Sequence, residues 1–72
     1  MGITLKACRV NRNLTQREAA QKLGITKESL ANYEQGKTFP NVPMIQKMEL
    51  LYGVPYADII FLPDENALSG NA

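Results

Sequence analysis

The sequence predicts an all-α domain of five short helices, without a convincing strand. Two observations support this prediction: capping hydroxyls and terminal glycines mark the helix ends, and apolar residues recur at helical spacing between them. At 72 residues the chain suffices for one domain, and its composition, 44% hydrophobic and 21% charged, is that of a globular protein. We assign residues 1–62 to this domain and interpret residues 63–72 as a polar, disordered tail.

The first predicted helix covers residues 3–12 and places Leu5 and Cys8 on one face, with Arg9 beside them. Asn13 can end this helix, because asparagine tolerates a left-handed backbone. Cys8 is the only cysteine of the chain, so no internal disulfide can form. We interpret it as a small core residue in a protein of the reducing cytoplasm.

The second and third predicted helices, residues 14–24 and 26–35, have the clearest signals. Thr15 and Glu18 form a T-x-x-E capping box for the first of them. A connection of three or four residues around G-I-T separates the two helices, which is helix-turn-helix spacing. Such a motif needs a small residue where the helices cross, a turn residue at positive φ, a capping hydroxyl and inward apolar side chains. The sequence meets these needs with Ala20, Gly24, Thr26, Leu30 and Tyr33.

The remaining helices are predicted over residues 42–53 and 55–60. Asn41 caps the first of them, Pro43 is tolerated in its first turn, and Gly53 ends it. No run of residues is long and apolar enough to cross a membrane, and the N-terminus lacks the apolar stretch of a signal peptide. We therefore expect no membrane association.

The stretch LTQREAAQKLGITKESLANYEQGKTFPNVPMIQKMELLYGVP resembles the Xre/Cro, or lambda-repressor-like, family of helix-turn-helix DNA-binding domains. The family frame reads L-T-Q-x-x-x-A-x-x-L-G-I-[ST] and then Y-E-x-G-x-x-x-P, and the similarity covers residues 3–60. The resemblance implies a compact five-helix domain in which helices 2 and 3 form the helix-turn-helix and helix 3 enters the DNA major groove. It also implies a transcriptional repressor of phage or bacterial type, which binds a double-stranded DNA operator as a homodimer, at least on DNA.

The resemblance assigns base reading to the outer face of residues 26–35, which carries hydrogen-bonding groups where an ordinary surface helix carries ion pairs. The base-reading residues are Thr26, Lys27, Glu28 and Asn32. Asn32 could pair with adenine, Lys27 could donate to guanine, and Glu28 could accept from the amino group of cytosine. The alternative for each residue is that it is a solvated surface side chain.

Other roles also follow from the resemblance. The residues expected to contact the DNA backbone, which position the protein without reading sequence, are Arg12, Gln16, Arg17, Ser29, Gln35, Lys37 and Thr38. Arg9 and Glu34 are expected to form a partly buried ion pair within the fold. Removing one partner of such a pair costs roughly 3–5 kcal/mol, so we expect Arg9→Ala to destabilise the protein.

The C-terminal half departs from the family pattern. Glu49 stands where a small apolar residue is usual, and Leu50 stands where a charge is usual, which leaves the packing of the fourth helix open. An exposed apolar patch that serves as a dimer contact could comprise Leu50, Tyr56, Ile60 and Phe61. The alternative is that Ile60 and Phe61 fold back onto the core.

The distribution of charge suggests a basic working half and a neutral-to-acidic supporting half; the alternative is a chance arrangement of a few charges. The net charge is only +1, but residues 1–40 carry seven Lys and Arg against three Glu, whereas residues 41–72 carry one Lys against four acidic residues. The chain has no histidine, no P-loop and no metal-ligand set, so we expect neither an enzyme nor a cofactor. The alternative to DNA binding is a helix-turn-helix module that binds a protein partner, such as an antirepressor or an accessory factor.

Overall fold

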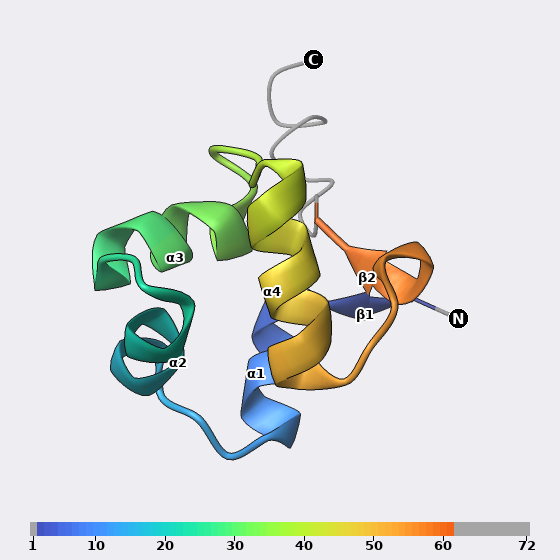
Figure 1. Ribbon diagram of the computed structural model, residues 1–72, viewed down its shortest axis with the longest axis horizontal. Coiled ribbons are helices and arrows are strands. Elements are labelled where there is room, and N and C mark those ends of the chain that lie inside the picture. The colour runs from blue at the N-terminus through green and yellow to red at the C-terminus, as the bar shows by residue number, and fades with distance from the viewer. Residues whose placement is uncertain (1, 62–72) are drawn as a thin grey trace.

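The computed structural model describes residues 2–61, and Figure 1 shows how its elements are arranged. In chain order the elements are β1 (Ile3–Thr4), α1 (Leu5–Asn11), α2 (Gln16–Leu23), α3 (Lys27–Gln35), α4 (Val42–Tyr52), the 3-10 turn η1 (Tyr56–Asp58) and β2 (Ile59–Ile60). Helices α2 and α3 lie on one side of the molecule, α4 passes through the middle, and the two strands lie on the opposite side (Figure 1). The tail expected over residues 63–72 lies outside the described residues.

The predicted capping box of the second helix and the residues predicted to end the first two helices are confirmed by the backbone geometry. The Thr15 hydroxyl accepts a hydrogen bond from the Glu18 amide, and the Glu18 carboxylate accepts one from the Thr15 amide, so both halves of the capping box form. Gly24 ends α2 with φ +77°, a left-handed conformation that glycine adopts without steric cost. Asn13 also adopts a left-handed backbone, with φ +59°.

The expectation of five helices and no strand is wrong at both ends of the chain. The segment predicted as a fifth helix, residues 55–60, forms one 3-10 turn and then the extended strand β2. This strand pairs in parallel with β1, with Ile3 opposite Ile59. The first helix therefore begins at Leu5, where the hydroxyl of Thr4 caps it by accepting from the amide of Ala7. Two β-branched isoleucines at positions 59 and 60 favour the extended backbone over a continued helix.

The core joins all four helices and β2. Leu5 and Cys8 from α1 meet Leu23 from α2, Leu30 from α3 and Met48 from α4, and each of these five side chains is at most 1% exposed. Cys8 is thus a core residue, and burial raises the pKa of its thiol. None of the helices in residues 2–61 combines the length and the apolar character that a bilayer crossing requires.

The exchange of Glu49 and Leu50 along α4 is accommodated without disturbing the core. Met48 supplies the buried contact, while Leu50 is 86% exposed. The carboxylate of Glu49 is half-buried and accepts a hydrogen bond of 2.6 Å from the backbone amide of Tyr56. Glu49 therefore ties the end of α4 to the 3-10 turn.

Candidate nucleic-acid interface

Helices α2 and α3 form a two-helix motif with a tight connection. Gly24, Ile25 and Thr26 link the two helices, and the amide of Ile25 donates back to the carbonyl of Ala20. Ala20 is 2% exposed, so the small side chain that the motif requires lies in the core. The motif is therefore a helix-turn-helix held by its own caps and by shared core contacts.

The inner side of α3 is packed and its outer side is open. Leu30 is fully buried, Glu34 is 8% exposed and Tyr33 is partly buried. Six side chains on the outer side of α3 reach solvent. Exposed are Lys27, Glu28 and Gln35, and partly buried are Ser29, Ala31 and Asn32. All of these except Ala31 carry donors or acceptors that match base edges or phosphate oxygens. The structure thus brings three of the expected base-reading residues, Lys27, Glu28 and Asn32, onto one exposed face.

The fourth expected base reader, Thr26, has a structural task in the free protein. Its hydroxyl accepts from the backbone amide of Ser29 at 3.1 Å and donates to the hydroxyl of Ser29 at 2.9 Å. Both side chains are therefore engaged with each other at the start of α3. Thr26 is nevertheless exposed, at the same end of α3 as Lys27 and Glu28.

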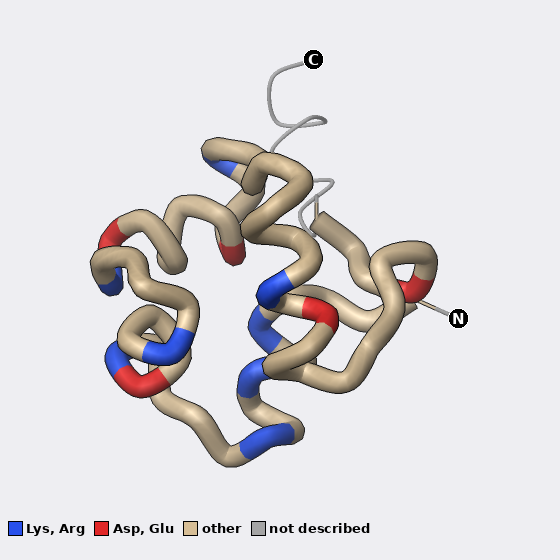
Figure 2. Tube along the Cα trace, viewed as in Figure 1, with Lys and Arg blue, Asp and Glu red and all other residues tan. Residues whose placement is uncertain are grey.

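The expected backbone contacts fall into two groups. Gln16 and Arg17 open α2, and Lys37 and Thr38 follow the left-handed Gly36 at the end of α3; of these four only Gln16 is partly buried. Arg12 lies elsewhere, because its guanidinium Nε donates to the carbonyl of Tyr52 at 3.0 Å, at the end of α4. The side of α2 and α3 carries charges of both signs and is not a continuous basic stripe (Figure 2).

A buried ion pair supports this face from inside. The guanidinium Nε of Arg9 lies 2.7 Å from a carboxylate oxygen of Glu34, and both residues are 8% exposed. Arg9 also donates to the carbonyl of Leu14 at 2.9 Å. The amide nitrogen of Gln16 donates to Glu34 at 3.0 Å, so the carboxylate links α1, α2 and α3. The structure thus brings together Arg9 and Glu34, the ion pair that the family resemblance implied, and adds Gln16 to them.

Comparison with known proteins places this geometry in a family. The helix-turn-helix family profile matches residues 5–59, which includes α1 to α4 and the turn after them. The chain belongs to the Xre/Cro-like helix-turn-helix family. Among residues 2–61 no three His, Cys, Asp or Glu side chains gather in a way that could hold a metal ion.

Several regulators share the helix-turn-helix sequence with this chain. It is 34% identical to the transcriptional repressor RstR of a cryptic CTXphi phage in Vibrio cholerae. The 56 aligned residues cover 78% of this chain and 50% of RstR. It is 39% identical to the regulator ImmR of Bacillus subtilis, and the 54 aligned residues cover 75% of this chain and 42% of ImmR. It is 34% identical over 61 residues to an uncharacterised regulator of Methanocaldococcus jannaschii, which covers 85% of this chain and 92% of that protein. The chain thus spans about half the length of RstR, and no solved structure matches it significantly.

The helix-turn-helix domain also exposes apolar side chains on its C-terminal half. Leu50 is 86% exposed, Tyr56 49% and Ile60 38%, as a patch would require. Phe61 does not belong to it: this side chain is 7% exposed and its ring lies 5.0 Å from the ring of Phe39. The alternative of folding back onto the core is therefore correct for Phe61 and wrong for Ile60.

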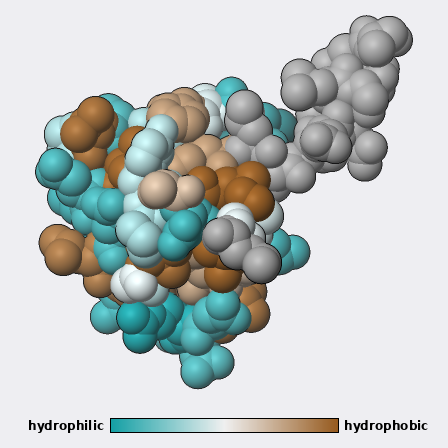
Figure 3. Space-filling view, turned by 90° about the vertical axis from the view of Figure 1, so that its right-hand side faces the viewer, coloured by the Kyte–Doolittle hydropathy of each residue, from teal (hydrophilic) through white to brown (hydrophobic). Residues whose placement is uncertain are grey.

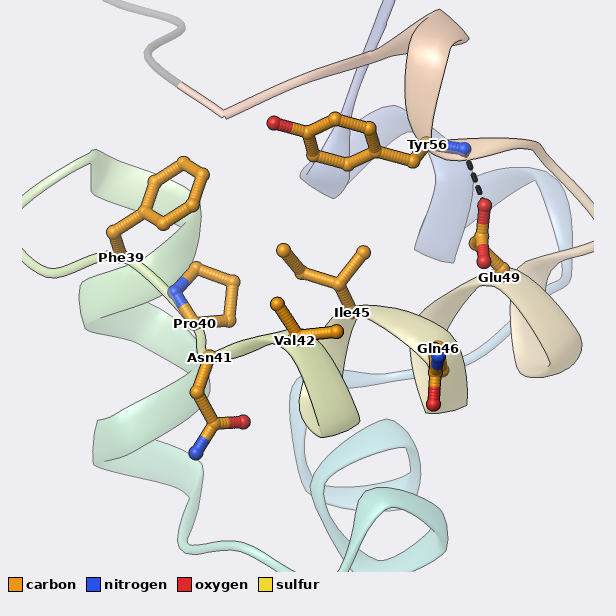
Figure 4. A pocket seen from close by; sticks show the side chains of 8 residues that line it. All are labelled: Phe39, Pro40, Asn41, Val42, Ile45, Gln46, Glu49 and Tyr56. Carbon is orange, nitrogen blue, oxygen red and sulfur yellow. Dashed lines mark hydrogen bonds between the residues drawn. The ribbon is translucent and has the colours of Figure 1, made fainter.

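A groove that includes Tyr56 adds two exposed apolar residues, Phe39 and Val42, that the sequence did not lead us to expect. We call it the C-terminal groove, and Figure 4 shows the side chains that line it: Phe39, Pro40, Asn41, Val42, Ile45, Gln46, Glu49 and Tyr56. Phe39 is 55% exposed and Val42 is 65% exposed. A phenylalanine inside the otherwise polar loop after Gly36 was the signal that could have revealed it. Apolar side chains also reach the surface on the strand side of the molecule (Figure 3).

Proposed function

We propose that this protein is a sequence-specific double-stranded DNA-binding regulator of transcription, of the repressor type, with α3 as the helix that enters the major groove. One observation carries the proposal: the outer face of α3 presents hydrogen-bonding side chains, while its inner face is locked into the core of a helix-turn-helix. The names of the relatives RstR and ImmR, a repressor and a regulator, support it. The buried, unpaired thiol of Cys8 suits a cytoplasmic protein.

Within this proposal Lys27, Glu28 and Asn32 read bases, and Thr26 holds the start of α3 in place while it faces the same groove. Asn32 is the strongest of these, because its amide matches both the donor and the acceptor of adenine in the major groove. The phosphate contacts come from the ends of the two helices: Gln16, Arg17, Ser29, Gln35, Lys37 and Thr38. Arg12 is exposed and engages the Tyr52 carbonyl through Nε alone, so its Nη groups remain as donors for a further phosphate contact.

The protein acts as a homodimer on DNA, so that two copies of α3 enter successive major grooves. Two half-sites of such an operator lie about 34 Å apart, one turn of the duplex. The C-terminal groove, which includes Tyr56, together with the exposed side chains of Leu50 and Ile60, is the surface that we assign to the contact between copies. It contains few charges, so two copies of it can approach each other without strong repulsion.

Selection of bound sites from a random duplex pool tests the proposal. The wild-type protein, at two salt concentrations, should enrich a palindrome whose half-sites are about one helical turn apart. Asn32→Ala should relax the preference at one base pair in each half-site, with a loss of roughly 1–3 kcal/mol for the wild-type base. Asn11→Ala, at an exposed position at the end of α1, is the matched control and should select the wild-type site.

Two outcomes would count against the proposal. No enrichment at either salt concentration would favour a module that binds a protein partner through the same face. Enrichment by Asn32→Ala of the unchanged wild-type site would remove α3 from its role as the reading helix.

A further inference from the structure

The Glu34 carboxylate does more than neutralise Arg9. One of its oxygens accepts from the Arg9 Nε at 2.7 Å, and the other accepts from Arg9 Nη2 at 3.3 Å and from the Gln16 amide at 3.0 Å. Glu34 lies on α3, Arg9 on α1, and Gln16 is the first residue of α2. A single buried group therefore connects the start of α2 to the last turn of the helix that is proposed to read DNA.

The contact with Glu34 fixes the orientation of the Gln16 side chain. An ionised carboxylate can only accept hydrogen bonds, so the end of the Gln16 amide that faces it must be the NH2 group and not the carbonyl oxygen. One amide hydrogen then binds Glu34, and the second hydrogen and the carbonyl oxygen remain for other partners. Glu34 is 8% exposed and Gln16 is partly buried. The Gln16 amide is therefore anchored by a buried group, while the Gln16 side chain still reaches solvent.

An unrestrained glutamine would be a poorer phosphate ligand. Its side chain loses about 1–2 kcal/mol of rotamer entropy when it is fixed, and either end of a free amide can face outward. A carbonyl oxygen turned to a phosphate is repelled, whereas an N–H binds it. The charge of Glu34 itself does not oppose DNA, because Arg9 neutralises it at close range.

We propose that Glu34 is a positioning residue for DNA binding, which holds the Gln16 amide by its nitrogen so that the second N–H of that nitrogen is available to the phosphate backbone. The inference rests on the proposed DNA-binding function and deepens it. Glu34 touches no DNA in this arrangement and acts through Gln16. Its contribution is the orientation that Gln16 already has before DNA arrives.

A double-mutant cycle separates this role from a contribution to stability. The four proteins are wild type, Gln16→Ala, Glu34→Gln and the double variant, and their affinities for the selected operator are measured at one salt concentration, at a temperature where circular dichroism shows all four folded. We expect each single variant to bind about 3- to 10-fold more weakly and the double variant to bind no more weakly than the weaker single variant. The unpaired charge of Arg9 is present in both Glu34→Gln proteins, so its effect cancels in the cycle.

The control cycle combines Glu34→Gln with Lys37→Ala. Lys37 lies after α3 and shares no hydrogen bond or ion pair with Glu34 among the described residues, so these two losses should multiply. Multiplicative losses in the Gln16 cycle as well would overturn the proposal. If Glu34→Gln does not fold, Glu34→Asp takes its place: it keeps the charge that Arg9 needs and shortens the side chain by one methylene, which withdraws it from Gln16.

A measurement without DNA tests the orientation directly. The side-chain NH2 resonances of Gln16 in a nitrogen-15 NMR spectrum should be displaced and protected from hydrogen exchange in the wild type, and should move to the free glutamine position in Glu34→Asp, which withdraws the carboxylate from Gln16. Unchanged resonances would refute the positioning role even if DNA binds. If the resonances move but none of the four proteins binds any selected duplex, the proposed function fails and the positioning role fails with it.

Discussion

The Tyr52 side chain lies in the core beside the ion pair, and its hydroxyl finds no hydrogen-bond partner among the described residues. Burial away from water raises the pKa of this phenol to about 12, and the negative charge of Glu34 adds to the effect. An exposed tyrosine in the unfolded chain titrates near pH 10. The folded state therefore holds the Tyr52 proton more tightly than the unfolded state does.

The sign of this difference predicts an alkaline limit of stability. The protonated Tyr52 phenol contributes to the free energy of unfolding. This contribution is fully present below pH 10 and is lost as the pH rises from 10 to about 12, because the unfolded chain releases the proton first. We expect Tyr52→Phe to reduce this loss, by about 1.4 kcal/mol at pH 11, and to leave stability at pH 7 equal or higher, since it removes a buried hydroxyl without a partner. Urea unfolding at pH 7 and pH 11 measures both effects. Tyr56→Phe, at an exposed position, should behave as the wild type, and an equal alkaline loss in Tyr52→Phe would contradict the assignment.

At the residue scale, the sequence predicted what depends on local pattern and resemblance. The outward position of Lys27, Glu28 and Asn32 follows from helical spacing, since Leu30 defines the inner side. The hydrogen bond between Gln16 and Glu34 could not be predicted, because it depends on how two helices cross. The hydrogen bond from Arg12 to the Tyr52 carbonyl could not be predicted for the same reason, since the two residues meet only when α1 and α4 pack together.

At the scale of elements, two glycines with the same backbone conformation have different surroundings. Gly24 ends α2 with φ +77° and Gly53 ends α4 with φ +70°. A Cβ at Gly24 would meet nothing within 4 Å, whereas a Cβ at Gly53 would overlap the guanidinium of Arg12. The first site is constrained by the backbone alone, and the second by the backbone and by a neighbouring side chain.

This difference makes a matched pair of variants. Gly24→Ala should cost about 1 kcal/mol for the left-handed backbone, which lowers Tm by roughly 4–8 °C for a domain of this size. Gly53→Ala should cost about 1 kcal/mol more, because Arg12 must leave the Tyr52 carbonyl. In an Arg12→Ala background the extra loss should disappear. A melting curve of Gly53→Ala that matches Gly24→Ala would show that Arg12 moves aside without cost.

The elements that the sequence predicted best are those with local signals at both ends. Helices α2, α3 and α4 each have a side-chain N-cap and a glycine C-cap, and their bounds agree with expectation within one or two residues. The pairing of β1 with β2 could not be predicted in the same way. Each strand is two residues long, and its partner lies at the other end of the described chain, so no local pattern specifies it.

At the scale of the whole molecule, the dimensions of the protein constrain how two copies bind one operator. The fold measures 36 × 26 × 23 Å, and half-sites one turn apart are separated by about 34 Å. Two copies in successive grooves on one side of the duplex therefore come into contact or nearly so. Phe39 follows Thr38 directly, so the C-terminal groove begins where the proposed phosphate contacts end.

A charge placed in this surface should separate dimer formation from DNA contact. Val42→Glu puts two carboxylates at a symmetric interface, so we expect at least tenfold weaker binding to a palindromic operator and unchanged binding to a single half-site. Val10→Glu is the control, because Val10 is an exposed apolar residue of α1, outside the patch, and the change in net charge is the same. Equal losses in the two variants, by gel shift on both duplexes, would place the dimer contact elsewhere.

The strand pair β1–β2 has a consequence for the order in which the protein opens. It joins positions 3 and 59, so forming it closes a loop that contains helices α1 to α4. The chain entropy lost in that closure is regained when the strands part. The contacts between α2 and α3 are close in sequence and need no such closure. We therefore expect the strands to separate first, as a local opening that leaves the helix-turn-helix intact, and the amides of the strand pair to exchange with deuterium sooner than those of α2 and α3.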